Sequence, residues 1–467
     1  MRTTALVAAA ALSPWAAVAA APPPLALAVD GASGQQAIDL LGPNLDAVAA
    51  WHRRSPEAFR QLLSDPAMRL DRQGRLYAVE PLDGPLPPAP AAAAAGPLGS
   101  SAPVLQQAPL DRTFQLHSRA TAKRTIYLDF TGAVLTDTAW NSGSAINALP
   151  YDFDGDTGSF SDAELERIQY IWQRVAEDFA PLDIDVTTEE PPAGRLTRRD
   201  PTDDVYGTTV VITNHNGVYN CSCGGIAYVG VFDMVGNFYK PALVFWDMLG
   251  NGEEKYVAEA ISHEAGHNLG LSHDGYAGGG YYPGHGTGDT GWAPIMGVGY
   301  YQPVVQWSKG EYDTANNLED DFAVMASYGA PLRVDDHGNS VGTASALTAT
   351  ASGGRLRLSG QGVIETRTDV DYLSFAAGAG PATITVSPAA RSPNLDAYIR
   401  ILRADGSEVA RANPTATLGV TLNFTLASAG TYYLVVDGVG LGDPKTNGYS
   451  GYGSVGQYKV SGSAPLP

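Results

Sequence analysis

The stretch ISHEAGHNLGLSHDG, residues 261–275, constrains this chain more than any other part of its sequence. It contains three of the chain's eight histidines. His263 and His267 are four residues apart, so on a helix they lie on one face, one turn apart. Two imidazoles in that arrangement can bind one zinc ion. Glu264 then lies beside the metal, where a carboxylate can take a proton from a bound water.

The residues after His267 extend this pattern. Gly270 can end the helix in a left-handed turn, which glycine adopts without strain. The chain can then reverse, so that His273 supplies a third ligand. Three protein ligands and one water are typical of catalytic zinc, whereas structural zinc sites have four protein ligands. A single histidine is more often a surface residue, or a core residue with its hydrogen bonds satisfied, than a metal ligand. The full pattern HExxHxxGxxH, however, rarely occurs by chance.

The sequence around the motif predicts a mixed α/β domain. Ser161 and Glu164 form a capping box, and the helix that begins there should end at Pro181. A second helix, about 253–269, carries the motif, and a third is expected near 318–327. Runs rich in β-branched and aromatic residues predict strands at 125–130, 183–188, 208–213, 227–232 and 242–246. This order favours a mixed twisted sheet with an active-site helix and an irregular lower part.

The N-terminal residues predict export. Residues 1–20 combine one arginine, an apolar run and small residues at 17–19, which is typical of a secretory signal peptide. A membrane anchor is the alternative, but the run is short. No later segment is long and apolar enough to span a bilayer. We therefore expect a secreted, extracellular protein with no membrane span.

Residues 21–112 form the next region. Two short helices and a strand at 76–79 are expected before a Pro/Ala/Gly-rich linker, residues 83–103, which cannot build a core. An exposed, cleavable linker between a signal and a larger domain favours a propeptide, and thus a zymogen. A small binding module is the alternative.

The C-terminal part differs from the preceding domain in its composition and in its predicted strands. The composition shifts after residue 329, and we assign 331–353 to a linker. Short strands with turns, including ADGS at 404–407, predict an all-β sandwich over 354–467. The formal net charge of −20 argues against nucleic-acid binding, which needs a basic surface.

Two further motifs predict local structure rather than a catalytic site. Cys221 and Cys223 are too few for a disulfide framework or a structural zinc site, so we expect a local disulfide or a pair that clamps its loop. Asp152, Asp154 and Asp156 alternate as calcium ligands often do, but they depart from the EF-hand pattern, which favours a solvated turn. A further acidic pair at 320–321 is expected to cap a helix.

The motif HEAGHNLGLSHDG resembles the metzincin zinc metalloproteases, most closely the adamalysin, or reprolysin, branch. This resemblance covers about residues 113–330, which it implies are the catalytic domain. GGIAYVGVF, residues 224–232, resembles the substrate-binding edge strand of that branch. The resemblance implies that substrate contacts Ala227, Tyr228, Val229 and Gly230. Metzincins also place a methionine in a tight turn beneath the zinc, and Met296 in APIMGVG fits this Met-turn, with plain packing as the alternative.

The C-terminal segments DVDYLSF, NLDAYIRILRADG and AGTYYLVV resemble the bacterial pre-peptidase C-terminal (PPC) domain, a β-sandwich appended to secreted proteases. Calcium, a further cofactor besides Zn2+, is implied there by resemblance alone, at Asp369, Asp371, Asp396 and Asp437.

The chain departs from animal adamalysins in three ways. It lacks the disulfide-bonded cysteines of those proteins, apart from Cys221 and Cys223, and no disintegrin-like region follows. Its propeptide has no cysteine, so latency must come from a carboxylate or from blockage of the cleft. Some metzincins place a tyrosine after the Met-turn to stabilise the oxyanion, but the spacing of Tyr300 and Tyr301 differs, so we expect these two to pack. We expect Asp274 to cap or brace the turn after His273, and His285 to be a loop or subsite residue rather than a fourth ligand.

These features predict a secreted zinc endopeptidase, a monomer that acts on proteins or peptides. Zinc held by His263, His267 and His273 binds a water, and Glu264 is the general base. The substrate adds as a strand to the edge at 227–232. A catalytically silent, zinc-containing adhesion protein is the alternative, against which the presence of Glu264 argues. A hydrolase of non-peptide substrates is a third reading.

Overall fold

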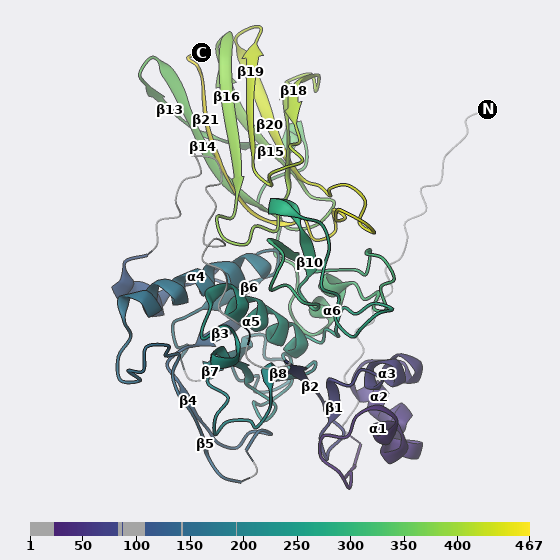
Figure 1. Ribbon diagram of the computed structural model, residues 1–467. Coiled ribbons are helices and arrows are strands. Elements are labelled where there is room, and N and C mark those ends of the chain that lie inside the picture. Colours follow the sequence, from purple (N-terminus) through teal and green to yellow (C-terminus); the bar gives the residue numbers. More distant parts are fainter. Residues whose placement is uncertain (1–22, 83–85, 87–107, 142, 193) are drawn as a thin grey trace, which may run out of the picture. The chain divides into compact units, whose positions relative to one another are not determined.

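The structure is a computed structural model that describes residues 23–82, 86, 108–141, 143–192 and 194–467 (Figure 1). The chain divides into two compact units, residues 1–76 and 77–467. The predicted signal peptide and, apart from residue 86, the predicted linker 83–103 lie outside the described residues.

The first unit contains three short helices where the sequence predicted two: α1 (Gly34–Leu41), α2 (Leu45–Trp51) and α3 (Pro56–Leu63), followed by β1 (Met68–Leu70). A 3-10 turn at Gly42–Asn44 separates α1 from α2, which is why one predicted helix becomes two. The hydroxyl of Ser55 caps α3 by accepting a hydrogen bond from the Ala58 amide at 3.1 Å.

The second unit is built on a mixed sheet, as predicted. Four parallel strands lie in the order β6 (Ile184–Thr187), β3 (Arg124–Asp129), β7 (Tyr206–Thr213) and β9 (Ala242–Phe245). β8 (Cys223–Tyr228) continues the sheet antiparallel to β9, and β2 (Leu76–Pro81) lies antiparallel to β8. β2 therefore occupies the side of β8 that would otherwise be an open edge.

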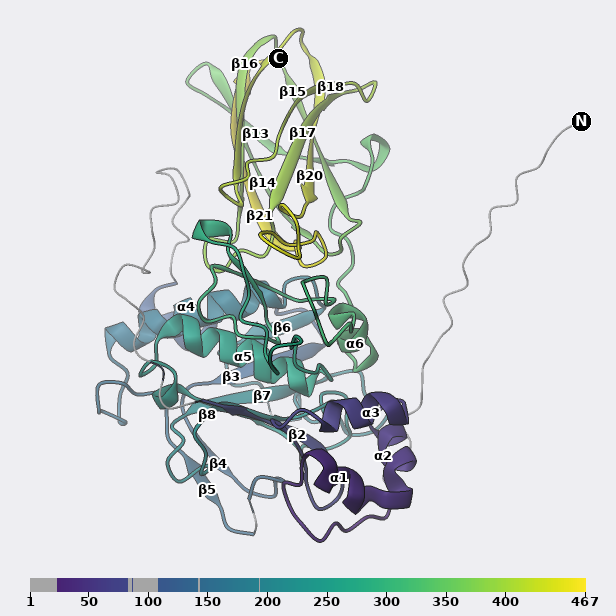
Figure 2. The same cartoon turned by 45° about the vertical axis from the view of Figure 1, so that its right-hand side comes forward.

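Two helices cover one face of this sheet. α4 (Asp162–Asp178) and α5 (Glu254–Asn268) lie side by side there (Figures 1 and 2), and the hairpin of β4 (Ala133–Leu135) and β5 (Ile146–Ala148) covers the other face. The predicted capping box is present at the start of α4, between Ser161 and Glu164. The motif helix α5 matches its predicted bounds to within a residue at each end.

The predicted strand 227–232 is wrong in its position, because β8 ends at Tyr228. The Gly230 amide donates to the carbonyl of His267 at 2.8 Å, and the Val231 amide donates to that of Asn268 at 2.9 Å. These carbonyls lie at the C-terminal end of α5, where a helix has no partners of its own for them. Gly230 makes the turn with a φ of 66°. Val229 and Gly230 therefore lie beyond the strand, under the end of the helix.

After α5 the chain is largely irregular, with two short paired strands, β10 (Trp292–Pro294) and β11 (Val304–Gln306), before α6 (Asp321–Ser327). As predicted, Asp320 caps α6, since its carboxylate accepts from the Ala323 amide at 3.1 Å. Asp321 accepts instead from the Ser308 amide and is buried.

The C-terminal region, residues 345–465, contains two five-stranded sheets, in the orders β12-β15-β20-β17-β18 and β13-β14-β21-β16-β19. The strands are β12 (Ser345–Ala346), β13 (Thr348–Ser352), β14 (Arg355–Ile364), β15 (Val370–Ala377), β16 (Gly380–Pro388), β17 (Ala397–Arg403), β18 (Glu408–Ala412), β19 (Val420–Leu426), β20 (Gly430–Gly438) and β21 (Gly456–Pro465). The predicted turn at 404–407 joins the antiparallel strands β17 and β18. β12 and β13 lie within the segment 331–353 that we assigned to a linker. Among the described residues, no helix combines the length and apolarity needed to cross a bilayer.

Candidate metal centre

The structure brings the three motif histidines together. His263 and His267 project from α5, and His273 follows the turn that ends the helix. All three are buried, and the Nε2 atoms of His267 and His273 lie 3.1 Å apart. With Glu80 they form a group whose ligand atoms all lie within 4.8 Å of one another. This arrangement could hold one metal ion.

The turn between His267 and His273 depends on Gly270, as predicted. Its φ is 94°, and its amide donates to the carbonyl of His267 at 2.8 Å. Gly270 also packs against the ring of Tyr328, which leaves no room for a β-carbon: one added there would overlap Cδ2 and Cε2 of that ring. Gly230 meets the same ring from a second position, so a β-carbon there would lie 2.5 Å from Cε1. Two glycines thus make room for one tyrosine beside the end of α5.

The histidines are held in the form that binds metals. His263 Nδ1 donates to the carbonyl of Ile295 at 2.9 Å, and His267 Nδ1 donates to that of Leu271 at 2.9 Å. Such bonds orient the ring and leave Nε2 to face the ligand. Burial lowers the pKa of His267 to about 4, so this imidazole is neutral at pH 7. His263 Nε2 is buried and makes no hydrogen bond. Imidazole nitrogens that converge on a buried carboxylate fit a cation between them.

Glu264 lies against the sheet rather than in solvent. Its side chain is buried and neither oxygen has a hydrogen-bond partner. Its carboxylate packs on Gly225 of β8, where an added β-carbon would lie 2.7 Å from Cδ and overlap Oε1. Burial and the charge of Glu80 hold its pKa well above the usual range. The side chain of Glu264, the residue next to His263, therefore lies in contact with β8.

Met296 lies directly beneath the motif helix. It is fully buried, and a β-carbon added to Gly266 would lie 2.7 Å from its sulfur. Its carbonyl accepts from the Asp274 amide at 2.8 Å. Asp274 is buried, and burial and the charge of Glu319 raise its pKa to about 8. Its expected role in bracing the turn after His273 stays a prediction. Ile295, which supports His263, and Met296 therefore form one turn under the histidines.

Glu80 is the site residue that sequence reasoning missed. It belongs to β2 and is 9% exposed. Its Oε1 lies 2.9 Å from His273 Nε2 and 3.2 Å from His267 Nε2, and its Oε2 lies 3.5 Å from His263 Nε2. Burial raises the pKa of Glu80, but the charges of His273 and His263 outweigh it and hold the pKa well below the usual range.

Tyr281 completes this contact and was also missed. Its hydroxyl donates to Glu80 Oε2 at 2.6 Å, and its ring lies 4.4 Å from that of His273, centroid to centroid. No local pattern singles out Tyr281 in a segment rich in glycine and tyrosine.

Of the four residues predicted to contact substrate, two lie in β8. Ala227 is paired with Ala78 of β2, and Tyr228 with Tyr77. Tyr77 packs into an aromatic group, 5.4 Å from the Tyr228 ring and 5.9 Å from that of Trp140, centroid to centroid. The place predicted for a substrate strand is therefore filled by the chain's own segment.

The weaker candidates lie elsewhere. His285 Nδ1 accepts from the hydroxyl of Tyr282 at 2.7 Å, and its Nε2 donates to the carbonyl of Gly448 at 2.5 Å, so it belongs to a loop rather than to the histidine group. Tyr300 packs against Tyr256 with ring centroids 5.3 Å apart, and Tyr301 is 62% exposed.

Several of the acidic candidates for calcium lie in small clusters of carboxylates. Asp152 Oδ1 accepts from the amides of Asp154 at 3.0 Å and Gly155 at 2.6 Å. Asp152 is buried rather than solvated, and it forms with Asp154 and Glu164 a group whose ligand atoms lie within 4.8 Å of one another. Asp369 and Asp371 lie within 4.8 Å of Asp335. Such clusters of acidic side chains do not by themselves show a bound ion, so calcium is not supported.

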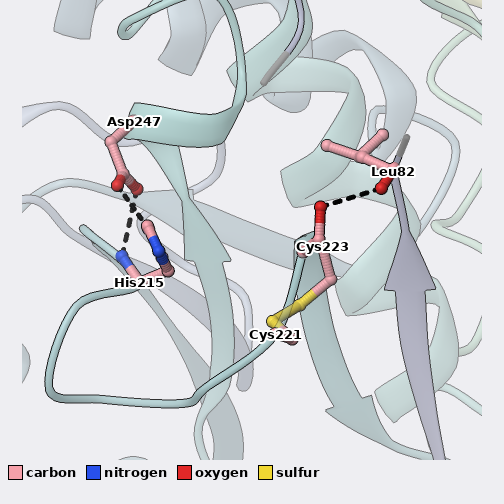
Figure 3. The surroundings of a disulfide bond; sticks show 6 residues. Leu82, His215, Cys221, Cys223 and Asp247 are labelled. Atoms are coloured by element: carbon pink, nitrogen blue, oxygen red, sulfur yellow. Dashed lines mark hydrogen bonds and ion pairs between the residues drawn. A yellow bond between two sulfur atoms is a disulfide. The ribbon is translucent and has the colours of Figure 1, made fainter. Parts of the chain in front are cut away.

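A disulfide joins Cys221 and Cys223 at the start of β8, one of the two states expected (Figure 3). Between them, Ser222 accepts from the Leu82 amide at 2.9 Å, and its hydroxyl donates to the Leu82 carbonyl at 2.8 Å. His215, earlier in the same loop, pairs with Asp247, its Nδ1 lying 2.5 Å from Oδ2 (Figure 3). The disulfide loop thus holds the chain just after β2.

One of the comparisons with known proteins bears on the histidine motif. Residues 194–274 match the family described as metallo-peptidase family M12B, reprolysin-like. This match supports a metalloprotease, and with it a zinc-dependent hydrolase. It covers part of the chain and ends just after His273. No curated protein matches the chain.

Three solved structures show similarity to parts or most of this chain. The pre-peptidase C-terminal domain of a Bacillus anthracis collagenase is 18% identical over 22% of this chain and 86% of its own, with a TM-score of 0.16. PliG from Aeromonas hydrophila, a periplasmic inhibitor of g-type lysozyme, is 13% identical over 26% and 95%, with a TM-score of 0.19. OgpA from Akkermansia muciniphila is 12% identical over 73% and 93%, with a TM-score of 0.19. At such TM-scores these likenesses carry no argument about this chain.

Proposed function

We propose that this chain is a zinc endopeptidase that hydrolyses peptide bonds of extracellular proteins. One observation carries the proposal: three buried histidines converge through Nε2, and the residue after the first of them is a buried glutamate that faces β8. His263, His267 and His273 would hold the metal. A zinc ion there would polarise the peptide carbonyl and lower the pKa of a bound water.

The chain's own residues supply the rest of the mechanism. Substrate would lie extended along β8, hydrogen-bonded to the backbone that includes Ala227 and Tyr228. Glu264, at the strand, would take a proton from the attacking water and pass it to the leaving amine. Ile295 would keep His263 oriented, and Met296 would support the helix from below.

We also propose the finer layout expected from the sequence. The catalytic domain, about 113–330, would be a metzincin of the adamalysin branch, and 354–467 a PPC-like β-sandwich. Residues 1–20 would be a signal peptide and 21–112 a propeptide of the secreted zymogen. What supports these boundaries is the composition of the segments and the motifs that they carry.

The competing function is a zinc-containing but catalytically silent binding protein. These two functions are separated by comparing the full chain with its Glu264→Gln variant, each after the proposed propeptide has been cut away. We expect Glu264→Gln to hold one zinc and to lose at least about 100-fold in the rate of casein hydrolysis, because the general base is gone. Glu254→Gln is the matched control, on the same helix but outside the histidine group, and should cut at the normal rate. Zinc binding without cleavage by any form would favour the silent protein.

A further inference from the structure

The strand β2 pairs with β8 in the manner of a peptide ligand. Its backbone pairs antiparallel with β8 in the register Tyr77 with Tyr228, Ala78 with Ala227 and Val79 with Ile226. An extended segment that adds to an open strand edge is a common mode of peptide recognition. Beyond β2, Leu82 is bonded twice to Ser222, so the segment is held on both sides of Glu80.

The side chains of β2 alternate between two environments, as those of a strand must. Tyr77 and Val79 join the apolar cluster on the face of β8 that holds Ile226 and Tyr228. Glu80 points the other way, to the histidines. One segment therefore fills both the strand position beside β8 and the position beside the three histidines.

The Glu80 carboxylate is placed where a fourth ligand belongs. It approaches the Nε2 atoms of all three histidines at 2.9 to 3.5 Å, and Tyr281 fixes its other oxygen by a 2.6 Å hydrogen bond. Zinc sites with four protein ligands are closed, whereas hydrolysis needs a position for water. A buried carboxylate is itself costly, and a cation bound beside it offsets that cost.

We propose that Glu80 is a fourth, removable ligand of the metal site, and that β2 is an inhibitory strand that keeps the uncut chain inactive. This inference rests on the proposed function. The closed state ends when the chain is cut after β2 and the segment leaves β8, which vacates the fourth position for water and the strand edge for substrate. The Pro/Ala/Gly-rich sequence of 83–103 offers the place for that cut.

The test measures access to the metal rather than activity. The full chain is prepared as Glu264→Gln, so that it does not cut itself, and is loaded with Co2+, whose visible spectrum reports its ligands. Acetohydroxamate, a small metal-binding molecule, is then titrated into this chain and into the same chain with Glu80→Ala or the isosteric Glu80→Gln. Glu57→Gln, an exposed glutamate of α3, is the control.

We expect acetohydroxamate to bind the Co2+ of the Glu80→Ala and Glu80→Gln chains at least 10-fold more tightly than that of the parent and of Glu57→Gln. Each chain should hold one Co2+, which also shows that the variants fold. Equal affinity in all four chains would overturn the role of Glu80 and leave the proposed function standing. Failure of the parent chain to bind Co2+ or Zn2+ at all would remove the proposed function, and the inhibitory strand with it.

Discussion

Replacing Gly270 by alanine tests whether the turn of the motif is set by the packing seen here. Two costs add at this position. A φ of 94° is unfavourable for alanine by about 1 kcal/mol, and the new β-carbon overlaps the Tyr328 ring. Overpacking of a buried site costs about 1–3 kcal/mol. We therefore expect Gly270→Ala to destabilise the second unit by about 2–4 kcal/mol.

Gly155 provides a matched control. It has the same φ of 94°, but a β-carbon there would meet nothing within 4 Å. Gly155→Ala should therefore cost only the backbone term, about 1 kcal/mol. The difference between the two variants isolates the contact with Tyr328.

The assay is urea unfolding of the full chain, followed by tryptophan fluorescence, with zinc affinity measured in parallel. Gly270→Ala should lower the midpoint more than Gly155→Ala and should also weaken zinc binding, because the turn positions His273. Equal midpoints for the two variants would refute the argument from packing. An unchanged zinc affinity would refute the link from the turn to His273.

Three further predictions address the metal, the pH dependence and the oxyanion. Removing zinc with a chelator should lower the unfolding free energy, by about 2.7 kcal/mol relative to zinc at 100 times its Kd, and re-adding zinc should restore it. Glu177 contacts Gln457 of the C-terminal region. Burial raises the pKa of Glu177 to about 8. An unfolded glutamate titrates near pH 4, so unfolding releases a proton and stability falls as pH rises from about 4 to 8, by at most about 1.4 kcal/mol per pH unit. Glu177→Gln should flatten this slope in urea titrations, and an unchanged slope would exclude Glu177 as its source. The Tyr281 hydroxyl donates to Glu80 Oε2 in the uncut chain. Once Glu80 has left, we expect this hydroxyl to donate to the carbonyl oxygen of the substrate that gains charge in the reaction, so Tyr281→Phe should lower kcat of the activated protein about 100-fold with little change in KM. An unchanged kcat would remove this role.

The parts of the structure that the sequence predicted are those governed by local rules. The capping box of Ser161 and Glu164 starts α4, and the left-handed Gly270 ends the turn after α5. Two of the histidines are four residues apart on one helix and the third follows the turn after it, so the geometry of the helix and turn brings them together. The mixed sheet followed from the order of strands and helices.

The parts that the sequence missed depend on contacts between distant segments. Glu80 lies 183 residues before His263, and an isolated glutamate in LYAVEP has no local feature that marks it as a ligand. The end of β8 was placed four residues too late, because the carbonyls at the end of α5 draw the backbone of Gly230 and Val231 out of the sheet. An apolar run shows no sign of that competition.

The most direct test of the central claim follows peptide hydrolysis in 18O-labelled water. The full chain is first nicked with a trace of elastase, which cuts after small residues such as the alanines at 91–95, and the elastase is then inactivated. Incubated with a protein substrate, the chain should yield peptides whose new carboxyl groups carry 18O. A chelator should abolish these products, and zinc should restore them. Products that persist after metal removal, or a zinc-loaded chain that yields none, would contradict the account.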